Sequence, residues 1–456
     1  MSENEIPAEV DVIVIGMGIG GEAVASKVAE AGLQVIGIES DLVGGECPYW
    51  GCIPSKMMIR GANLLAEARR IEGVAGKAEV TPDWAPIAQR IREQATDDWN
   101  DQVAVDRFVD KGGLFIRGRG RITAPKTVEV DGATYTARIG VVVAAGTNPA
   151  VPPIPGLSDV DYWTNRQAMQ VETLPQSLVV LGSGAIGAEL AEVFARFGVQ
   201  VSIIEALDRL MPREEPEVGE LMQEVFESEG IGVHVGALAT AVARDGDEIV
   251  VTLEDGTEVR GEKLLVATGR RTNVEGLGLD NVGIELDSPY VPVDDHLQVA
   301  DGVWAVGDIT GKGLFTHVAA YQAPIAAASI LGEEHAPADY RAMPRVTFTD
   351  PEVGSVGLTE QEARDAGLNV AVATQNVPWS ARGWLHSSGN EGIIKLVVDA
   401  DRDVLVGATS VGPHGGEVLA MLTLAVHGEL PLSTLRSMIY AYPTFHRGVE
   451  DALGQL

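Results

Sequence analysis

The chain contains only two cysteines, Cys47 and Cys52, which lie close together in a stretch of residues 44–56 that is rich in glycine. Such a pair can be a structural disulfide, part of a metal site or a redox couple. A disulfide that closes so short a loop restricts little chain entropy, and a chain of 456 residues has a core large enough not to need it. Zinc normally takes four ligands, and no cluster of further cysteine or histidine ligands lies nearby. The pattern therefore favours a redox pair.

The residues after the pair suit a reactive thiol. The nucleophile is the thiolate, which positive potential stabilises, and the N-terminus of a helix supplies such potential. We expect a helix to begin just after the pair, with Lys56 in its first turn. The stretch thus combines two neighbouring thiols with two sources of positive potential.

A motif typical of dinucleotide binding precedes the cysteines. The apolar run at residues 10–15 predicts a buried parallel strand, and the loop G-M-G-I-G-G at 16–21 follows it. A helix of small residues and a strand over 34–38 come next, and the unit ends at Glu39. The glycines permit a tight turn and close approach of a pyrophosphate, while Glu39 can bind a ribose hydroxyl.

The same arrangement appears a second time, which makes it an internal repeat. Residues 177–181 predict a strand, the loop at 182–187 reads G-S-G-A-I-G, and residues 188–197 predict a helix. A strand over 199–204 follows and ends at Glu205. Two dinucleotide folds in one chain indicate two bound dinucleotides.

Glu205 predicts which nicotinamide cofactor binds to the second fold. A carboxylate accepts a hydrogen bond from a ribose 2′-hydroxyl and repels a 2′-phosphate, so Glu205 favours NAD(H) over NADP(H). Arg209 and Arg213 lie nearby in the sequence and weaken this preference, because a guanidinium can bind a phosphate.

Further elements connect and extend these two folds. A helical pattern covers residues 59–108, and Trp84 and Trp99 within it are expected to pack in the core or between helices. Prolines between residues 149 and 155 mark a linker. Other strands are expected at 114–116, 127–130, 141–144, 263–266 and 304–308. From about Ala336 a separate α+β domain is expected, with strands at 346–348, 393–398 and 405–411 and helices at 416–426, 432–438 and 445–453.

Acidic residues outnumber basic ones by 66 to 33, which gives a net charge of −33. Electrostatic repulsion argues against nucleic acid and anionic membranes as partners. The first five residues lack the features of a secretory signal, and no apolar run is long enough to span a membrane. We therefore expect a soluble, cytoplasmic protein.

The chain resembles the flavoprotein disulfide reductases, the class I pyridine nucleotide-disulfide oxidoreductases that include dihydrolipoamide dehydrogenase, glutathione reductase and mercuric reductase. The pattern G-G-x-C-x-x-x-G-C-x-P-S-K at 44–56 is highly specific for them. The resemblance covers nearly the whole chain, and its other motifs lie at 16–21, 182–189, 267–271, 305–308 and 349–357.

The resemblance implies an α/β fold with two Rossmann-like dinucleotide-binding domains and a C-terminal α+β dimerisation domain. FAD would bind to the first fold and NAD(H), in preference to NADP(H), to the second. The protein would be a homodimer whose active site is shared between subunits. The expected domains are an FAD-binding domain at 1–150 and 273–335, an NAD(P)-binding domain at 151–272 and an interface domain at 336–456.

By the same resemblance, Cys52 is the thiol that interacts with the flavin, and Cys47 is the outer thiol that attacks the substrate. Lys56 would lie beside the flavin and pair with Glu189. The alternative for Glu189 is an ordinary carboxylate on a helix surface.

The remaining cofactor contacts follow from the matching motifs. Asp308 would bind the ribityl chain of FAD, and Thr316 would begin a helix that points at the pyrimidine edge of the flavin and stabilises its reduced anion. The expected cofactor-binding residues are Gly16, Gly18, Gly21, Glu39, Gly45, Lys56, Gly120, Gly146, Gly182, Gly184, Gly187, Glu205, Gly269, Gly307, Asp308 and Thr316.

The sequence departs from the family pattern near its C-terminus. Typical members carry a catalytic histidine before a proline and a glutamate five residues beyond it. Here Tyr442 takes the histidine position and Arg447 the glutamate position. We expect Pro443 to open a helix with His446 about one turn along it, where His446 could replace the missing base or be an ordinary exposed histidine.

These features predict an NAD(P)H-dependent FAD disulfide oxidoreductase of the dihydrolipoamide dehydrogenase type, acting on a small-molecule or protein-bound disulfide or dithiol. The alternative enzyme resembles mercuric reductase and reduces a metal ion or quinone, because Tyr442 and Arg447 replace the dyad. Mercuric reductases also carry a C-terminal cysteine pair, which this chain lacks. A third hypothesis is a flavin-bound redox sensor that turns over slowly.

Overall fold

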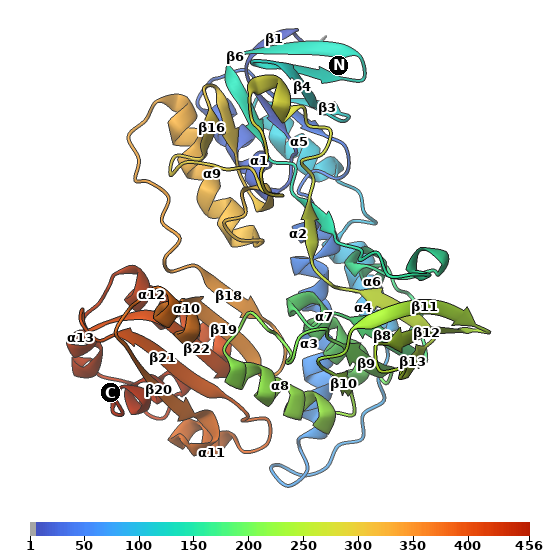
Figure 1. The fold of residues 1–456 in the computed structure, drawn as a ribbon, viewed down its shortest axis with the longest axis vertical. Helices are drawn as coiled ribbons and strands as arrows, with labels where there is room; N and C mark the ends of the chain where they lie inside the picture. The colour runs from blue at the N-terminus through green and yellow to red at the C-terminus, as the bar shows by residue number, and fades with distance from the viewer. Residues whose placement is uncertain (1–5) are drawn as a thin grey trace. The chain divides into compact units, whose positions relative to one another are not determined.

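The computed structural model describes residues 6–456, so the first five residues, where no secretory signal was expected, lie outside the described part. The chain forms two compact units (Figure 1). Of the described residues, the first unit contains those up to 54, 89–150 and 270–340, and the second contains 55–88, 151–269 and 341–456. One division falls within a helix, because α3 (Cys52–Arg69) begins in the first unit and continues in the second.

The first unit is built on an eight-stranded sheet with a parallel centre. Its strands follow the order β16-β17-β6-β1-β2-β3, and β4 and β5 extend it beside β6. β1 (Glu9–Ile15) and β2 (Val35–Glu39) are parallel neighbours with almost entirely buried side chains, because both faces of the sheet are covered. The other strands are β3 (Leu114–Arg117), β4 (Arg121–Ala124), β5 (Thr127–Val130), β6 (Ala133–Val143), β16 (Gln298–Ala300) and β17 (Val303–Ala305), and a two-stranded ribbon pairs β7 (Thr147–Pro149) with β15 (Arg270–Thr272).

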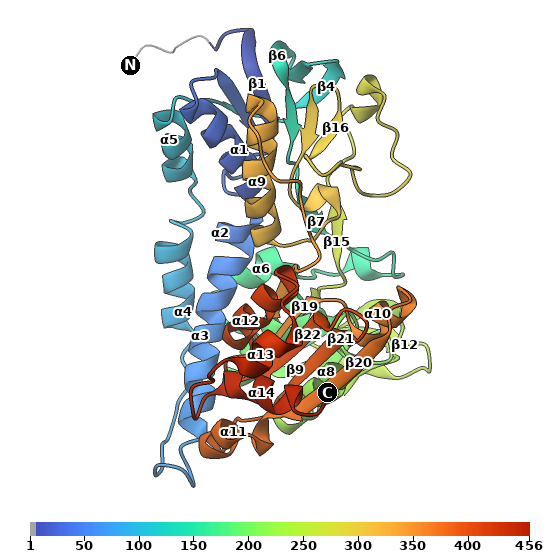
Figure 2. The ribbon, with the colours of Figure 1, turned by 90° about the vertical axis from the view of Figure 1, so that its left-hand side faces the viewer.

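Two helices of the first unit lie side by side against this sheet, α1 (Ile19–Glu30) and α9 (Thr316–Leu331) (Figures 1 and 2). Their contact faces carry small and apolar residues such as Ala25 and Ala326, which are fully buried. The small side chains allow the helices to pack closely on each other and on the sheet. Two more helices, α2 (Glu46–Trp50) and α5 (Gln102–Asp110), belong to the same unit.

The second unit contains a four-stranded parallel sheet in the order β10-β9-β8-β14. Its sequence of elements, β8-α7-β9-α8-β10, repeats the strand-helix-strand pattern that begins the first unit, where β1-α1-β2 leads to β3. The internal repeat predicted from the sequence is therefore confirmed. Its elements are β8 (Ser177–Leu181), α7 (Ala185–Arg196), β9 (Gln200–Ile204), α8 (Pro216–Ser228), β10 (Gly232–His234) and β14 (Lys263–Val266), and β11 (Ala239–Asp245), β12 (Glu248–Leu253) and β13 (Glu258–Gly261) form a separate antiparallel sheet.

The C-terminal residues of the second unit form an antiparallel sheet in the order β18-β19-β22-β21-β20. In Figure 2, α12, α13 and α14 lie over one face of it, and their apolar side chains form a common core with the sheet. The strands are β18 (Pro344–Thr347), β19 (Glu352–Gly357), β20 (Val370–Asn376), β21 (Ile393–Asp399) and β22 (Val404–Gly412), and the helices are α10 (Glu360–Asp365), α11 (Ala381–His386), α12 (Gly415–His427), α13 (Leu432–Ser437) and α14 (Gly448–Leu453).

This arrangement confirms the predicted fold class, with two Rossmann-like folds and a C-terminal α+β domain. Within residues 6–456, no helix is both long and apolar enough to cross a membrane.

The long helical pattern predicted over residues 59–108 is wrong in its continuity. Helix α3 ends at Arg69, and the next helix, α4 (Ala85–Arg90), runs into a π-helical turn at Ile91–Ala95 before α5. Three consecutive residues, 97–99, have positive φ angles of 47°, 56° and 55°, which no α-helix can continue through. Apolar spacing alone did not register these breaks.

A buried ion cluster joins helices of the second unit to the segment that follows β18. Its members are Arg70, Arg196, Glu192, Glu229 and Asp350. The Arg196 guanidinium lies 2.6 Å from Glu229 and 3.1 Å from each of the other two carboxylates. Burial raises the pKa of the Glu192 carboxyl well above its usual range, and the charge of Arg196 offsets this only in part. The neighbouring carboxylates of Glu229 and Asp350 also raise the pKa of Glu192.

We expect the substitution Glu192→Gln to change how thermal stability depends on pH. Because its pKa is raised in the folded state, wild-type protein loses stability as the pH rises from the ordinary glutamate pKa of about 4.3 towards the raised folded value. Glutamine does not titrate, so the melting temperature of the variant should rise relative to that of the wild type as the pH rises. Each kcal/mol of difference in unfolding free energy corresponds to about 2–4 °C in melting temperature.

Differential scanning fluorimetry of both proteins across this pH range measures the effect. The matched control is Glu224→Gln, because Glu224 is exposed on α8, and its difference from the wild type should not change with pH. A difference between Glu192→Gln and wild type that is equally constant across the pH range would contradict the raised pKa.

Candidate active site

The first glycine-rich loop connects β1 to α1 through a geometry that requires glycine. Gly16 has a φ of +93°, and a Cβ atom on Gly21 would lie only 1.9 Å from the carbonyl oxygen of Gly16. Gly18 stands immediately before the helix, and a Cβ atom there would lie no closer than 3.9 Å to its nearest neighbour. The loop thus leaves open space in front of the N-terminus of α1.

The second loop repeats this geometry between β8 and α7. Gly182 has a φ of +96°, and a Cβ atom on Gly187 would lie 2.0 Å from the carbonyl oxygen of Gly182. At Gly184, directly before α7, a Cβ atom would meet nothing within 4 Å. Because the amides of a helix N-terminus bind anions, both loops fit the pyrophosphate of a dinucleotide.

The two predicted ribose-binding acids occupy equivalent positions, and each also holds its own loop. Glu39 accepts hydrogen bonds from the amides of Met17 (2.7 Å) and Asp41 (2.8 Å). Glu205 accepts them from the amide (2.9 Å) and hydroxyl (2.7 Å) of Ser183 and from the amide of Leu207 (3.0 Å).

Each acid therefore bonds to the residue between the first two glycines of its loop. Burial raises the pKa of Glu39, and hydrogen bonds from the backbone amides around it oppose that rise. A carboxylate has about four acceptor positions, so each acid retains capacity for a ribose hydroxyl.

The predicted cofactor residues collect at the carboxyl edge of each parallel sheet, where ligands of such folds bind. In the first unit, Gly146 follows β6 with a φ of +65° and Gly307 follows β17 with a φ of +83°, while Gly120 lies against Ile15 at the end of β1. In the second unit, Gly269 follows β14 with a φ of +130°.

The cysteine stretch is tied directly to the first loop. The amide of Gly44 donates to the carbonyl of Met17 at 2.7 Å, and Gly44 forms an isolated parallel bridge with Gly18. Gly45 precedes α2 with a φ of +68°, and Cys47 is the second residue of that helix. Both cysteines are partly exposed.

Cys52 lies where two helices begin. It is the first residue of α3, and its Sγ is 3.3 Å from Oγ1 of Thr316, the first residue of α9. The N-termini of these long helices therefore both direct positive potential at the Cys52 sulfur, which favours its thiolate form. The predicted residues Cys52 and Thr316 are brought together.

A polar chain that sequence reasoning missed runs from the cysteine stretch to Asp308. The Arg270 guanidinium lies 3.2 Å from Glu46, the residue before Cys47, and also donates to Oγ1 of Thr147 at 2.7 Å. The Thr147 hydroxyl in turn donates to Asp308 at 2.6 Å. Burial raises the pKa of Asp308, and the Thr147 hydrogen bond opposes this rise. Arg270 belongs to a motif noted in the sequence, but nothing there indicated its partners.

Lys56 and Glu189 form an ion pair within the second unit. Lys56 Nζ lies 2.8 and 3.1 Å from the two carboxylate oxygens of Glu189 and 3.3 Å from Oγ of Ser55. Glu189 is buried and also accepts a hydrogen bond from the Phe348 amide at 2.9 Å. The alternative of an ordinary surface carboxylate at Glu189 is therefore wrong.

The C-terminal candidate residues Tyr442, His446 and Arg447 lie in the second unit. Tyr442 is exposed, and the Arg447 guanidinium stacks over its ring at 5.4 Å while pairing with Glu450 at 2.6 Å. His446 Nε2 is 3.4 Å from Oγ1 of Thr444.

The expectation that Pro443 opens a helix is wrong. Thr444 is extended (φ −136°, ψ 159°), so helical structure starts only with a 3₁₀ turn at Phe445–Arg447, ahead of α14. His446 therefore lies in this turn and not one turn along a helix.

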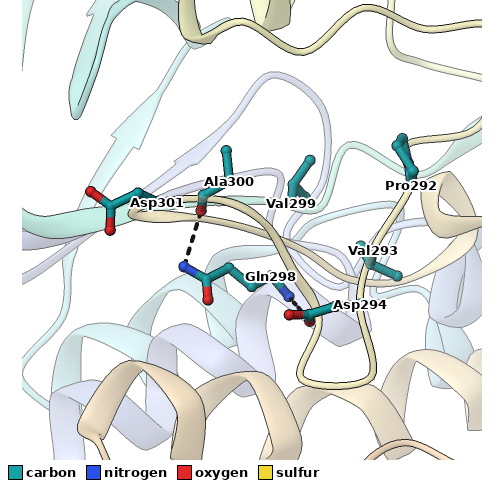
Figure 3. A pocket seen from close by; sticks show the side chains of 7 residues that line it. All are labelled: Pro292, Val293, Asp294, Gln298, Val299, Ala300 and Asp301. Carbon is teal, nitrogen blue, oxygen red and sulfur yellow. Dashed lines mark hydrogen bonds between the residues drawn. The ribbon is translucent and has the colours of Figure 1, made fainter.

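One pocket of the first unit lies apart from all the predicted residues. It is lined by Pro292, Val293, Asp294, Gln298, Val299, Ala300 and Asp301 (Figure 3). Within it the backbone amide of Gln298 donates to Asp294, and the Gln298 side chain donates to the carbonyl of Ala300. Among residues 6–456 no group of three or more acidic, histidine or cysteine side chains could hold a metal ion.

Two family models match the chain. Residues 10–323 match the model described as pyridine nucleotide-disulphide oxidoreductase, and residues 343–453 match its dimerisation domain.

Curated relatives are similar over most of their length. The chain is 35% identical to a dihydrolipoyl dehydrogenase from Thermus scotoductus, covering 97% of this chain and 96% of the relative. It is 32% identical to a mercuric reductase from Staphylococcus aureus, covering 99% of this chain and 84% of the relative.

Two solved structures are also similar to this chain over nearly its whole length. A copper(II) complex of a variant of RclA, a HOCl-induced flavoprotein disulfide reductase from Escherichia coli, matches with a TM-score of 0.86 and 25% identity over 98% of this chain and 99% of that one. LpdA from Mycobacterium tuberculosis matches with a TM-score of 0.85 and 27% identity over 98% of this chain and 99% of that one.

Proposed function

Because this chain belongs to the pyridine nucleotide-disulphide oxidoreductase family, we propose that it is an NAD(P)H-dependent disulfide oxidoreductase of the dihydrolipoyl dehydrogenase type, with Cys47 and Cys52 as its redox-active pair. The contact of the Cys52 sulfur with Thr316, at the start of two helices, is the observation that carries this proposal. A structural disulfide has no need of such positive potential, whereas a thiolate does.

The family uses FAD and a pyridine nucleotide, and both glycine-rich loops fit a dinucleotide. When bound, FAD supplies transfer of an electron pair between the nicotinamide and the cysteine pair. Gly16, Gly18, Gly21 and Glu39 would hold its adenosine diphosphate part, and Asp308 its ribityl chain. The equivalent nicotinamide site would consist of the loop at 182–187 and Glu205.

The two thiols have separate tasks. In the reductive direction, the Cys47 thiolate attacks one sulfur of the substrate disulfide, forms a mixed disulfide and releases a thiolate that takes a proton. The Cys52 thiolate then attacks the Cys47 sulfur, which releases the second substrate thiolate to be protonated and closes the Cys47–Cys52 disulfide. Thr316 and the helix N-termini favour the thiolate at Cys52, and we assign the same effect to the charge of Lys56.

The protein is proposed to be a homodimer built by residues 343–453, which match the dimerisation domain. This part of the chain exposes large apolar side chains, with Ile439 at 96%, Trp379 at 80%, Trp384 at 73% and Tyr442 at 70% of full exposure. Monomeric proteins seldom expose so many large apolar side chains to water, so we propose that a second copy of this chain buries them.

A second candidate is the reduction of a metal ion or quinone, favoured by Tyr442 and Arg447 in place of the acid–base dyad. Imidazoles ordinarily titrate near pH 6.5 and phenols near pH 10, so a phenol accepts protons poorly at neutral pH. Thiol–disulfide exchange needs such proton transfer, whereas reduction of a thiophilic metal ion or a quinone depends on it less. Relatives and structural neighbours include a mercuric reductase and a copper(II) complex of RclA.

Steady-state NADH oxidation with disulfide, metal-ion and quinone acceptors separates these candidates. High turnover with lipoamide supports the dehydrogenase type, and turnover confined to metal ions or quinones supports the second candidate. Slow turnover with every acceptor would favour the flavin-bound redox sensor.

The first prediction from this function concerns the thiol pair. Anaerobic addition of about two electrons per FAD should produce a long-wavelength absorbance band, because the Cys52 thiolate then lies against oxidised flavin. Cys47→Ser should show such a band without reduction, and Cys52→Ser should not show it at all. Simple bleaching of the flavin in reduced wild type would contradict the assignment.

The second concerns the nucleotide. We expect kcat/KM for NADH to exceed that for NADPH by about tenfold or more, which corresponds to about 1.4 kcal/mol. The buried Glu205 carboxylate would repel a 2′-phosphate, while Arg209 is engaged by Asp208 and the Pro212 carbonyl. Arg213→Ala is the control and should leave the ratio unchanged. Equal efficiencies would refute the preference, and a ratio that rises in Arg213→Ala would assign phosphate binding to Arg213.

The third concerns the missing dyad. Wild type should turn over lipoamide slowly near pH 7 and faster at higher pH, since a positioned base typically contributes about 10²–10⁴ in rate. The double substitution Tyr442→His with Arg447→Glu should raise lipoamide turnover and leave flavin reduction by NADH unchanged. If wild type is already fast at pH 7, loss of that rate in His446→Ala would identify His446 as the base, and retention would refute this account of the site.

A further inference from the structure

The Lys56 ammonium lies against an aromatic ring as well as a carboxylate. Its Nζ is 4.6 Å from the centroid of the Phe348 ring, well within the distance at which a ring face attracts a cation. The side chain of Lys56 is 35% exposed, so its ion pair with Glu189 is open to water and loses strength through screening. A second contact to the ammonium, such as one with a ring face, would therefore help to fix the position of the charge.

Phe348 contacts both members of this pair. Its ring faces Lys56, and its backbone amide donates to Oε1 of Glu189 at 2.9 Å. The same carboxylate accepts from Lys56 through both oxygens. The ring thus restrains the cation while the amide orients the anion.

The backbone that carries Phe348 is itself held rigidly. The amide of Asp350 donates to both carboxylate oxygens of Glu192 at 3.1 Å, and the Asp350 side chain lies 2.6 Å from Arg70 and 3.1 Å from Arg196. Thr349, which lies between Phe348 and Asp350 in the chain, is fully buried. These contacts fix residues 348–350 along α7, the helix that carries both Glu189 and Glu192.

We infer that Phe348 is a positioning residue for the Lys56–Glu189 pair, and that it keeps the Lys56 charge in place for the redox reaction of the cysteine pair. Lys56 comes four residues after Cys52 on α3. This inference rests on the proposed function, because only a redox reaction gives the position of that charge a catalytic consequence. Phe348 was not among the residues selected from the sequence.

Fluorination of the Phe348 ring separates its attraction for the Lys56 cation from the packing effect of its size. Replacing Phe348 by 4-fluoro-, 3,5-difluoro- and 3,4,5-trifluorophenylalanine withdraws charge from the ring face stepwise while nearly preserving its shape and its backbone amide. A cation–π contact then weakens in steps, whereas a packing contact does not. The same series at Phe226, a fully buried core residue of α8, is the matched control.

Two readouts on the purified FAD-loaded protein test the inference. The first is competitive acetylation of Lys56, measured by mass spectrometry relative to Lys312. It should rise about two- to fivefold across the Phe348 series, since a Lys56 side chain that the ring holds less tightly is more available to the reagent. The second is the rate of anaerobic flavin reduction by NADH, which is measured from the appearance of the charge-transfer band. This rate should fall by a similar factor across the Phe348 series.

Both changes together, absent from the Phe226 series, support the inference. Unchanged acetylation of Lys56 would overturn it, and so would increased acetylation with an unaltered flavin reaction, because the ring would then restrain Lys56 without serving the reaction. Failure of the proposed function is recognised separately, since unsubstituted protein would then show no flavin reduction by NADH at all.

Discussion

The structure depends on one steric constraint, the close approach of a helix N-terminus to the end of a parallel strand. At Gly21 and Gly187 the backbones approach so closely that a Cβ atom would lie 1.9 or 2.0 Å from a carbonyl oxygen. This contact sets each helix over the carboxyl edge of its sheet, where its unpaired amides can meet an anion. In the first unit the same edge receives the cysteine stretch, because the Gly44 amide bonds to the loop itself.

Much of the two dinucleotide-binding folds could be predicted from the sequence, because their motifs consist of residues that are close together in the chain. In each repeat the glycine loop, the apolar strands and the terminal acid, Glu39 or Glu205, lie within about 30 residues of chain, so pattern and topology coincide. The prediction failed where a local pattern had two outcomes. Apolar spacing across 59–108 does not reveal the breaks between its helices, and the predicted helix start at Pro443 is wrong because Thr444 is extended.

The contacts that surround the reacting groups were beyond the sequence for a different reason. Glu46 meets Arg270, and Lys56 meets Phe348, across hundreds of residues, and neither residue type indicates its partner. Such pairs are decided by how strands and helices stack, and a single sequence carries no record of that stacking. The candidate reactive residues could therefore be proposed from the sequence, whereas the contacts that hold them could not.

The bonding of Glu205 limits how freely this protein could be redesigned. Its carboxylate accepts hydrogen bonds from the amide and hydroxyl of Ser183 and from the amide of Leu207, so it is part of the loop's framework in addition to its proposed role in nucleotide choice. Replacing Glu205 with a neutral or basic residue, in order to bind a phosphorylated ribose, would leave these three hydrogen-bond donors without their acceptor. An engineer who wants to alter cofactor use must therefore rebuild positions 183 and 207 together with 205, or recruit a cation from elsewhere and leave the acid in place.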